Sequence, residues 1–253
     1  MIEVAKKAAI KAGEITLSLR GKRLAIKSKE RVGDFTTEAD LSSEREILRI
    51  LRTSFPKHNF KSEEMGEIDN GSDYWWIIDP LDGTIPFSSG LPTYGVSIGL
   101  LKDGEPVLGV INLPALDSLF WAEKDKGIYL KGEKVKVSDK KDLTKSVVGF
   151  DLEHMGGRKK ELQKLVEPIT DKVRYTPILG CSVAGSVYVA SCVYDAYLHS
   201  AYPWDFAAGA VIVKEAGGKV TDYEGRPIDW SKDWIDFFAS NGHLHNKILS
   251  LIG

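Results

Sequence analysis

Apolar residues near the start of the chain recur with helical spacing. Val4, Ala8, Ala12, Ile15 and Leu19 follow one another at steps of four, four, three and four, with charged and polar residues between them. This period places them along one face of an amphipathic helix, because about 3.6 residues make one turn. The chain is therefore predicted to begin with a helix that needs an apolar partner.

A second helix is predicted over residues 40–54, where apolar residues again recur at four-residue steps and Pro56 follows. Proline disfavours helical backbone in the residue before it, so the helix should end there. Thr37 and Asp40, three residues apart, resemble a capping arrangement at the helix start.

The middle of the chain changes to the shorter patterns of strands. Residues 74–78 form an apolar run that ends at Asp79, which suits a strand buried on both faces. Residues 94–101 and 106–112 are strand-like and are joined by a turn sequence at 102–105, which indicates a hairpin. Further strand-like runs continue this antiparallel pattern at 118–122, 127–130 and 135–137.

From about Arg158 the pattern becomes mixed, and helix-like stretches alternate with strand-like ones. Helices are predicted over 158–167, 182–192, 205–216 and 243–251. Strands are predicted over 146–150, 173–178, 195–200 and 236–240. The chain thus divides into an N-terminal α+β lobe, residues 1–145, with the helix pair and the antiparallel sheet, and a C-terminal α/β lobe, residues 146–253.

The length and charge of the chain narrow its function. Its 253 residues carry 34 lysines and arginines against 36 aspartates and glutamates, a formal net charge of −2. This balance argues against a protein that mainly binds nucleic acid or anionic lipid. We expect the six tryptophans to be core or interface residues rather than a base-stacking platform.

Cysteine use and the N-terminus indicate the compartment. A helix over 182–192 would hold Cys181 and Cys192 roughly 16 Å apart, whereas a disulfide needs Cα atoms about 4.4–6.8 Å apart. Both are therefore expected to be buried thiols in a reducing compartment. The N-terminus lacks the apolar segment of a signal peptide, and no run approaches the ~18 apolar residues of a membrane span. We expect a cytoplasmic protein.

Candidate chemistry concentrates at Asp79-Pro80-Leu81-Asp82-Gly83-Thr84. Its two carboxylates straddle a turn at the end of the apolar strand, where they could converge on a hard divalent cation. Gly83 permits backbone angles that other residues resist, and Pro80 stiffens the turn. The alternative is an ordinary strand-ending turn, since Asp, Pro and Gly all favour turns.

Other acidic positions have both a functional and a structural interpretation. Glu63 and Glu64 are adjacent, which is common on surface loops. Asp205 lies at the start of a predicted helix, where it could be only an N-cap, and Asp40 has the same alternative. The Ala-Ala-Gly sequence after Asp205 would allow very close packing of that helix.

Taken together, these motifs resemble the inositol monophosphatase family, within the superfamily that also contains the fructose-1,6-bisphosphatases. The resemblance rests on Glu-Glu, then Asp-Pro-Leu-Asp-Gly-Thr, then Trp-Asp-x-Ala-Ala-Gly, in this order along the chain. It is extended by Asp82–Pro92, Val96-Ser97-Ile98, Thr37–Asp40 and Glu215–Gly218. It implies an α+β fold arranged as a layered αβαβα sandwich, a homodimer and inhibition by lithium.

The resemblance also implies a role for each matched residue. The ligands of two or three Mg²⁺ ions would be Glu64, Asp79, Asp82, the carbonyl oxygen of Leu81, and Asp205 from the C-terminal lobe. The attacking water would be oriented and activated by Thr84, Asp40 and Glu64. The phosphate ester would be bound by Asp82, Gly83, Thr84, Gly180 and Asp205. An all-oxygen ligand set favours magnesium over zinc.

The predicted function is a Mg²⁺-dependent phosphomonoester hydrolase that acts on a small polyol or sugar phosphate. Inositol monophosphate is the leading substrate, followed by fructose 1,6-bisphosphate. Histidinol phosphate and 3'-phosphoadenosine 5'-phosphate stay open, since relatives with similar motifs cleave them.

Three departures from the family pattern concern the substrate. Ile85-Pro86 replaces polar residues beside the phosphate site, Pro177 replaces an arginine, and Leu198 stands where a glutamate would bind inositol hydroxyls. Each change removes a hydrogen-bonding group, so tight selectivity for myo-inositol phosphate is not expected.

Two functions of other classes remain open. Gly180-Cys181-Ser182 resembles a nucleophile elbow, and Asp205 and then His243 or His245 follow in the order of an α/β-hydrolase triad. No His-Gly-Gly oxyanion stretch accompanies them. The same pocket could instead bind a sugar phosphate without catalysis.

Overall fold

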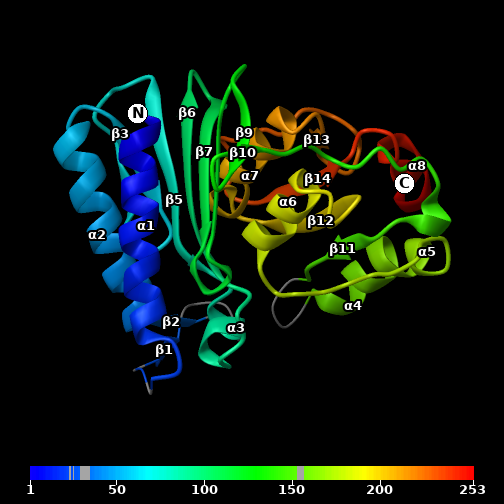
Figure 1. Ribbon diagram of the computed structural model, residues 1–253, viewed down its shortest axis with the longest axis horizontal. Coiled ribbons are helices and arrows are strands. Elements are labelled where there is room, and N and C mark those ends of the chain that lie inside the picture. The colour runs from blue at the N-terminus through cyan, green and yellow to red at the C-terminus, as the bar shows by residue number, and fades with distance from the viewer. Residues whose placement is uncertain (23, 25, 29–34, 153–156) are drawn as a thin grey trace.

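The computed structural model describes residues 1–22, 24, 26–28, 35–152 and 157–253. Its elements stack as a helix pair, an eight-stranded sheet, a second helix pair, a four-stranded sheet and an outer group of helices (Figure 1). This arrangement confirms the predicted αβαβα sandwich. None of the helices in the described part of the chain is both long and apolar enough to cross a membrane.

The first helix pair covers one face of the large sheet. Helices α1 (Ile2–Leu19) and α2 (Glu38–Ser54) match the two helices predicted from periodicity and pack on each other and on the sheet. The predicted capping arrangement is present: the Asp40 carboxylate accepts the Thr37 N–H at 2.8 Å, and the Thr37 hydroxyl accepts the Ala39 N–H at 3.1 Å.

The large sheet has the order β10-β9-β8-β7-β6-β5-β3-β4 and is antiparallel except for the pair β3–β5. Its strands are β3 (Asn59–Ser62), β4 (Gly66–Ile68), β5 (Tyr74–Asp82), β6 (Gly95–Lys102), β7 (Glu105–Leu113), β8 (Ser118–Glu123), β9 (Gly127–Leu130) and β10 (Glu133–Lys134). The predicted hairpin is β6–β7. A separate antiparallel pair is β1 (Ile26–Ser28) and β2 (Phe35–Thr37).

The small sheet has the order β11-β12-β14-β13. Its strands are β11 (Val148–Phe150), β12 (Ala196–Ala201), β13 (Lys219–Thr221) and β14 (Ile235–Ser240). Helices α6 (Ser182–Ala190) and α7 (Pro203–Glu215) lie between the sheets. The remaining elements are α3 (Thr84–Ser88), η1 (Pro114–Leu116), η2 (Leu143–Lys145), α4 (Arg158–Glu161), the π-helical η3 (Leu162–Val166), α5 (Glu167–Thr170) and α8 (His245–Ile252).

Two of the predicted strands do not form as expected. Residues 135–137 lie beyond β10, because the Val137 N–H donates to the Ala216 carbonyl at the end of α7 instead of to a strand. Residues 173–178 make only isolated bridges to the segment around β11, and Pro177 has no N–H with which to extend them. Cys181 is buried as expected, but Cys192 is exposed.

Alternating side chains of the large sheet contribute to two different apolar cores. On β5, Trp76 and Ile78 pack with α1 and α2, whereas Ile77 faces α6 and α7. The core around α6 and α7 also contains Tyr197 and Phe237 of the small sheet, so residues on both sides of position 145 share it. The predicted burial of this strand on both faces is confirmed.

Helix α7 lies unusually close to the large sheet. A Cβ atom on Gly109 of β7 would lie 2.3 Å from the Ala208 carbonyl oxygen, and one on Gly99 of β6 would lie 2.9 Å from the Ala207 Cβ. On the other side of α7, a Cβ on Gly209 would lie 2.6 Å from Ser186 of α6. The predicted close packing of the Ala-Ala-Gly face is therefore confirmed, and it sets the distance between α7 and the sheet.

We expect Gly109→Ala to lower the free energy of unfolding by about 3 kcal/mol or more, because the new methyl group meets backbone that cannot rotate away. Chemical denaturation measures this change. Gly71→Ala is the control: its left-handed backbone (φ +70°) faces open space, so about 1 kcal/mol of strain is expected. Equal losses for the two variants would contradict the close approach of α7.

Candidate active site

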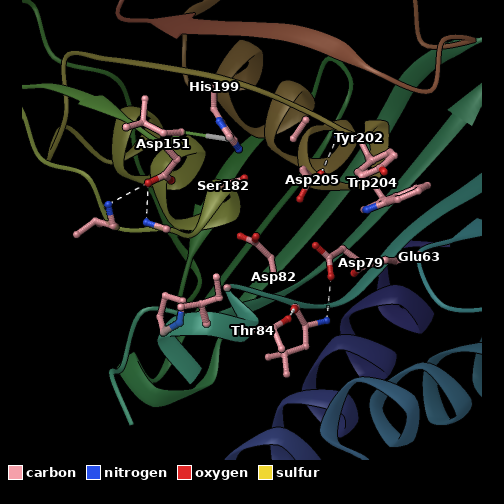
Figure 2. Close-up of a pocket in the computed structure, with 18 of the residues that line it drawn as sticks. Glu63, Asp79, Asp82, Thr84, Asp151, Ser182, His199, Tyr202, Trp204 and Asp205 are labelled. Carbon is pink, nitrogen blue, oxygen red and sulfur yellow. Dashed lines mark hydrogen bonds between the residues drawn. The ribbon is translucent and has the colours of Figure 1, made fainter. Parts of the chain in front are cut away.

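Two predicted carboxylates, Asp79 and Asp82, lie where β5 stops being regular. In a regular strand residues three apart point to opposite faces, because side chains alternate. Here the pairing with β6 shifts between Asp79, opposite Ser97, and Asp82, opposite Gly95. Three steps along β5 thus match two along β6, and both carboxylates reach the same cavity (Figure 2).

The third carboxylate comes from the other half of the chain. Asp205 lies in the first turn of α7, and its carboxylate accepts the Tyr202 N–H at 2.9 Å. Figure 2 shows it close to Asp79 and Asp82, and one oxygen atom from each of these buried side chains lies within 4.8 Å of the other two. Asp205 therefore caps its helix and also belongs to the acidic cluster.

The cluster concentrates negative charge in a cavity of about 490 Å³. Among the described lining residues, five are acidic and only Arg158 is a lysine or arginine. Burial, followed by the charges of Glu63, Asp82 and Asp205, raises the pKa of Asp79 well above its ordinary value. Burial also raises the pKa of Asp82 to about 6. Ionised carboxylates in this setting are costly until a cation joins them, and their oxygen atoms suit a hard divalent ion.

The structure corrects the choice between Glu63 and Glu64. The Glu63 N–H donates to the Ile78 carbonyl at 3.2 Å, which extends the β3–β5 pairing and sets Glu63 beside Asp79 in the cavity lining. Glu64 does not line the cavity, and its N–H donates to Glu44 at 3.1 Å. Glu63, rather than the predicted ligand Glu64, therefore lies beside Asp79 in the cavity lining, while the charge of Glu64 acts on the neighbouring Asp40.

The structure brings the predicted pair Thr84 and Asp40 together. The Thr84 hydroxyl lies 3.1 Å from Asp40 Oδ1 and 3.1 Å from the Leu81 carbonyl oxygen. Burial raises the pKa of Asp40, although hydrogen bonds from the Thr37 N–H and hydroxyl act against this shift. Asp40 thus caps α2 through one oxygen and contacts Thr84 through the other.

Gly83 forms the N-cap of α3 and requires glycine for two reasons. Its φ of +80° is left-handed, and a Cβ atom would lie 2.9 Å from the Thr93 carbonyl oxygen. Gly83, Thr84 and Ile85 all line the cavity, and no side chain caps α3. The first turn of this short helix therefore borders the acidic cluster.

Asp151 is a cavity residue that the sequence analysis missed. Its buried carboxylate accepts hydrogen bonds from the N–H groups of Leu179 (3.0 Å), Gly180 (2.5 Å) and Cys181 (3.1 Å) and from the Tyr197 hydroxyl (2.8 Å). The Asp82 carboxylate accepts a further hydrogen bond from the Val183 N–H at 2.8 Å. Two carboxylates therefore hold the start of α6 and the predicted substrate residue Gly180. The available signal was an aspartate directly after a predicted strand, as with Asp79.

The register of β12 also differs from expectation. Leu198, expected at the substrate position, is buried in the outer core with Phe238. Its neighbour His199 lines the cavity instead and lies edge-on to Phe206, with ring centroids 5.9 Å apart. Because side chains alternate along a strand, a shift of one residue exchanges an apolar core residue for a polar cavity residue.

The geometry excludes the alternative Ser-Asp-His triad. Ser182 lines the cavity, but His245 is buried elsewhere, with its ring nitrogens 2.9 Å from the Thr221 hydroxyl and 2.8 Å from the Ser240 hydroxyl. His243 is exposed and does not line the cavity. Neither histidine can activate Ser182, so the serine-hydrolase interpretation is wrong.

Comparisons with known proteins give one consistent result. The model of the inositol monophosphatase family matches residues 1–252. A fructose-1,6-bisphosphatase/inositol-1-monophosphatase of Thermotoga maritima is 35% identical over 96% of this chain and 91% of its own length. An inositol-1-monophosphatase of Synechocystis is 36% identical over 98% and 86%. The crystal structure of extragenic suppressor protein suhB from Bartonella henselae superposes with a TM-score of 0.93 at 32% identity, covering 99% of this chain and 97% of that one.

We expect Asp82→Asn to stabilise the metal-free protein at pH 7 by up to about 3 kcal/mol. The raised pKa means that the folded state binds a proton more tightly than the unfolded chain. The free energy of unfolding of the wild type therefore falls as the pH rises from about 4 through 6. The uncharged Asn side chain of the variant does not titrate, so the variant avoids this loss. Thermal unfolding with and without MgCl₂ tests the idea: Mg²⁺ should stabilise the wild type more than the variant. Asp142→Asn, at an exposed carboxylate, should keep the full Mg²⁺ effect.

We expect Asp151→Asn to lower the free energy of unfolding by about 2 kcal/mol, because N–H groups lose a charged acceptor. Tyr197→Phe removes one of the four bonds to this carboxylate and should cost about 1 kcal/mol. Urea denaturation of both variants measures the difference. A smaller loss for Asp151→Asn than for Tyr197→Phe would contradict the role assigned to the carboxylate.

Proposed function

The chain belongs to the inositol monophosphatase family, whose members are metal-dependent phosphatases, and from this premise we propose that it hydrolyses small polyol or sugar phosphates with Mg²⁺. The observation that carries the proposal is the group of three buried carboxylates within 4.8 Å, in one cavity with Thr84. Carboxylates this close together suit metal ions, and the phosphatase names of the relatives favour catalysis over the binding of a sugar phosphate alone.

The ion ligands in this proposal are Asp79, Asp82, Asp205, the Leu81 carbonyl oxygen, and Glu63 in place of Glu64. All are oxygen donors, which favours Mg²⁺ over zinc. When two or three such ions are bound, they neutralise the phosphate and lower the pKa of a coordinated water.

Thr84 and Asp40 serve as the proton acceptors for the attacking water. The Thr84 hydroxyl can accept a proton from the water at its oxygen while it passes its own proton to Asp40 Oδ1, 3.1 Å away. The raised pKa of Asp40 makes it a stronger proton acceptor than an exposed carboxylate. The N–H groups of Gly83 and Thr84 at the start of α3 bind the phosphate oxygens.

Gly180 and Asp205 border the alcohol that leaves. Inositol monophosphate is the leading substrate and fructose 1,6-bisphosphate the second, in line with the names of the Thermotoga and Synechocystis relatives. Histidinol phosphate and 3'-phosphoadenosine 5'-phosphate are the alternatives. We further propose a cytoplasmic homodimer that is sensitive to lithium.

We expect Asp79→Asn to lower phosphate release by at least about a hundredfold while the protein stays folded. The assay measures phosphate from the four candidate substrates with Mg²⁺, with EDTA and with added lithium, and EDTA should abolish turnover by the wild type. Circular dichroism checks the fold of the variant.

The matched control is Asp117→Asn, at an exposed carboxylate that pairs with Lys131 at 2.6 Å and lies outside the cavity lining. It makes the same chemical change and should keep full activity. Near-normal turnover by Asp79→Asn, or turnover by the wild type in EDTA, would disprove the metal-dependent mechanism.

A further inference from the structure

Three aromatic side chains line the cavity beside Asp205. Tyr202 and Trp204 are stacked, with ring centroids 4.4 Å apart at 12°, and Trp234 lies edge-on to Tyr202 with centroids 5.1 Å apart at 81°. Each ring is partly exposed. Trp204 and Trp234 pack against the central core, as expected, and also line the cavity.

The backbone on both sides of these rings is held in place. Tyr202 is the N-cap residue of α7 and Trp204 lies in its first turn. The Asp205 carboxylate accepts the Tyr202 N–H, and the Ser97 hydroxyl donates to the Trp204 carbonyl at 3.1 Å. Figure 2 shows Tyr202 and Trp204 on the same side of the cavity as Asp205. A group bound at the acidic cluster thus has aromatic rings next to it.

Trp234 lies in the loop before β14 and lines the cavity. An ion pair connects this loop to the large sheet. Lys61 of β3 donates to Asp233 at 3.0 Å and also pairs with Glu67 at 2.7 Å. Lys61 is mostly buried, so its position is well defined. The pair links residues 172 positions apart in the chain and holds the segment that carries Trp234.

Much of the remaining lining away from the carboxylates is also apolar. Ile85, Leu91 and Ile178 border the cavity and are 41–52% exposed. Arg158 and His199 are the basic side chains among the described lining residues. This part of the cavity lining therefore offers mainly carbon surface.

We propose that Tyr202, Trp204 and Trp234 form a ring-binding wall for the alcohol part of the substrate. The C–H face of a cyclic alcohol packs on the aromatic rings while its phosphate lies at the acidic cluster, so phosphate esters of cyclic alcohols are preferred over acyclic ones. Flat contact with an aromatic face buries area that a short acyclic chain cannot supply. This inference rests on the proposed phosphatase function and names the residues that select its substrate.

The test compares wild type, Trp234→Ala and Trp234→Phe on two esters with saturating Mg²⁺. Myo-inositol 1-phosphate has a cyclic alcohol, and glycerol 2-phosphate has an acyclic one. For Trp234→Ala we expect kcat/KM to fall about tenfold on the cyclic ester, mainly through KM, and less than twofold on the acyclic one. Trp234→Phe keeps an aromatic ring and should recover most of the loss.

Asp233→Asn tests the ion pair that holds the wall. Its side chain is exposed and lies outside the cavity lining, so loss of the charge should loosen the loop without touching the substrate. We expect a smaller rise in KM on the cyclic ester than for Trp234→Ala, and no change on glycerol 2-phosphate.

Equal losses on the two esters, or no loss on either, would overturn the ring-binding wall while the phosphatase function stands. If the wild type releases phosphate from neither ester and from none of the other candidate substrates, the proposed function fails. The wall is then tested by calorimetric titration with myo-inositol 1-phosphate and Mg²⁺, where Trp234→Ala should weaken binding about tenfold. Unchanged binding in that titration would overturn it as well.

Discussion

The site depends on the burial of like charges against one another. Asp79, Asp82 and Asp205 lie close together in a cavity with five acidic side chains, and burial raises the pKa values of Asp79 and Asp82. Burying unpaired charges in a protein interior costs free energy of folding, so this group of carboxylates destabilises the fold unless something offsets its charge. A bound metal ion would relieve this cost, and the family to which the chain belongs consists of metal-dependent phosphatases. The same carboxylates therefore lower the stability of the metal-free fold and provide the ligands that a metal ion needs.

Close packing between the layers brings the cluster together. Asp205 belongs to a helix that sits directly on β6 and β7, because Gly99 and Gly109 leave room for its backbone. The irregular end of β5 presents Asp79 and Asp82 from the sheet side. The central core contains residues from both sheets and both inner helices, so the two halves of the chain are held as one scaffold. The distance between carboxylates is therefore a property of helix-on-sheet packing.

Sequence patterns predicted the helices, the strands and the local motifs. They did not predict which of two adjacent residues has its side chain in the cavity. Helical periodicity, the Thr37–Asp40 cap and the hairpin of β6 and β7 each depend on contacts within a short stretch of chain. That Glu63 and His199 line the cavity, and their neighbours Glu64 and Leu198 do not, depends on strand register against distant partners. A shift of one residue in a strand reverses the side chain's direction, and spacing along the sequence does not report it. Asp151 was missed because its partners, Leu179–Cys181, lie far along the chain.

The contacts of α7 with the sheet have a consequence for how this protein can diverge. At Gly99 and Gly109 any larger residue meets the helix, so the scaffold there admits almost no variation. The rings and aliphatic side chains at the cavity mouth are partly exposed, and many replacements there would leave the cores intact. In the proposed ring-binding wall, substitutions can accordingly change which alcohol is accepted while the close packing of α7 stays intact. New specificities within such a lineage would arise at the rim, by few substitutions and at little cost in stability.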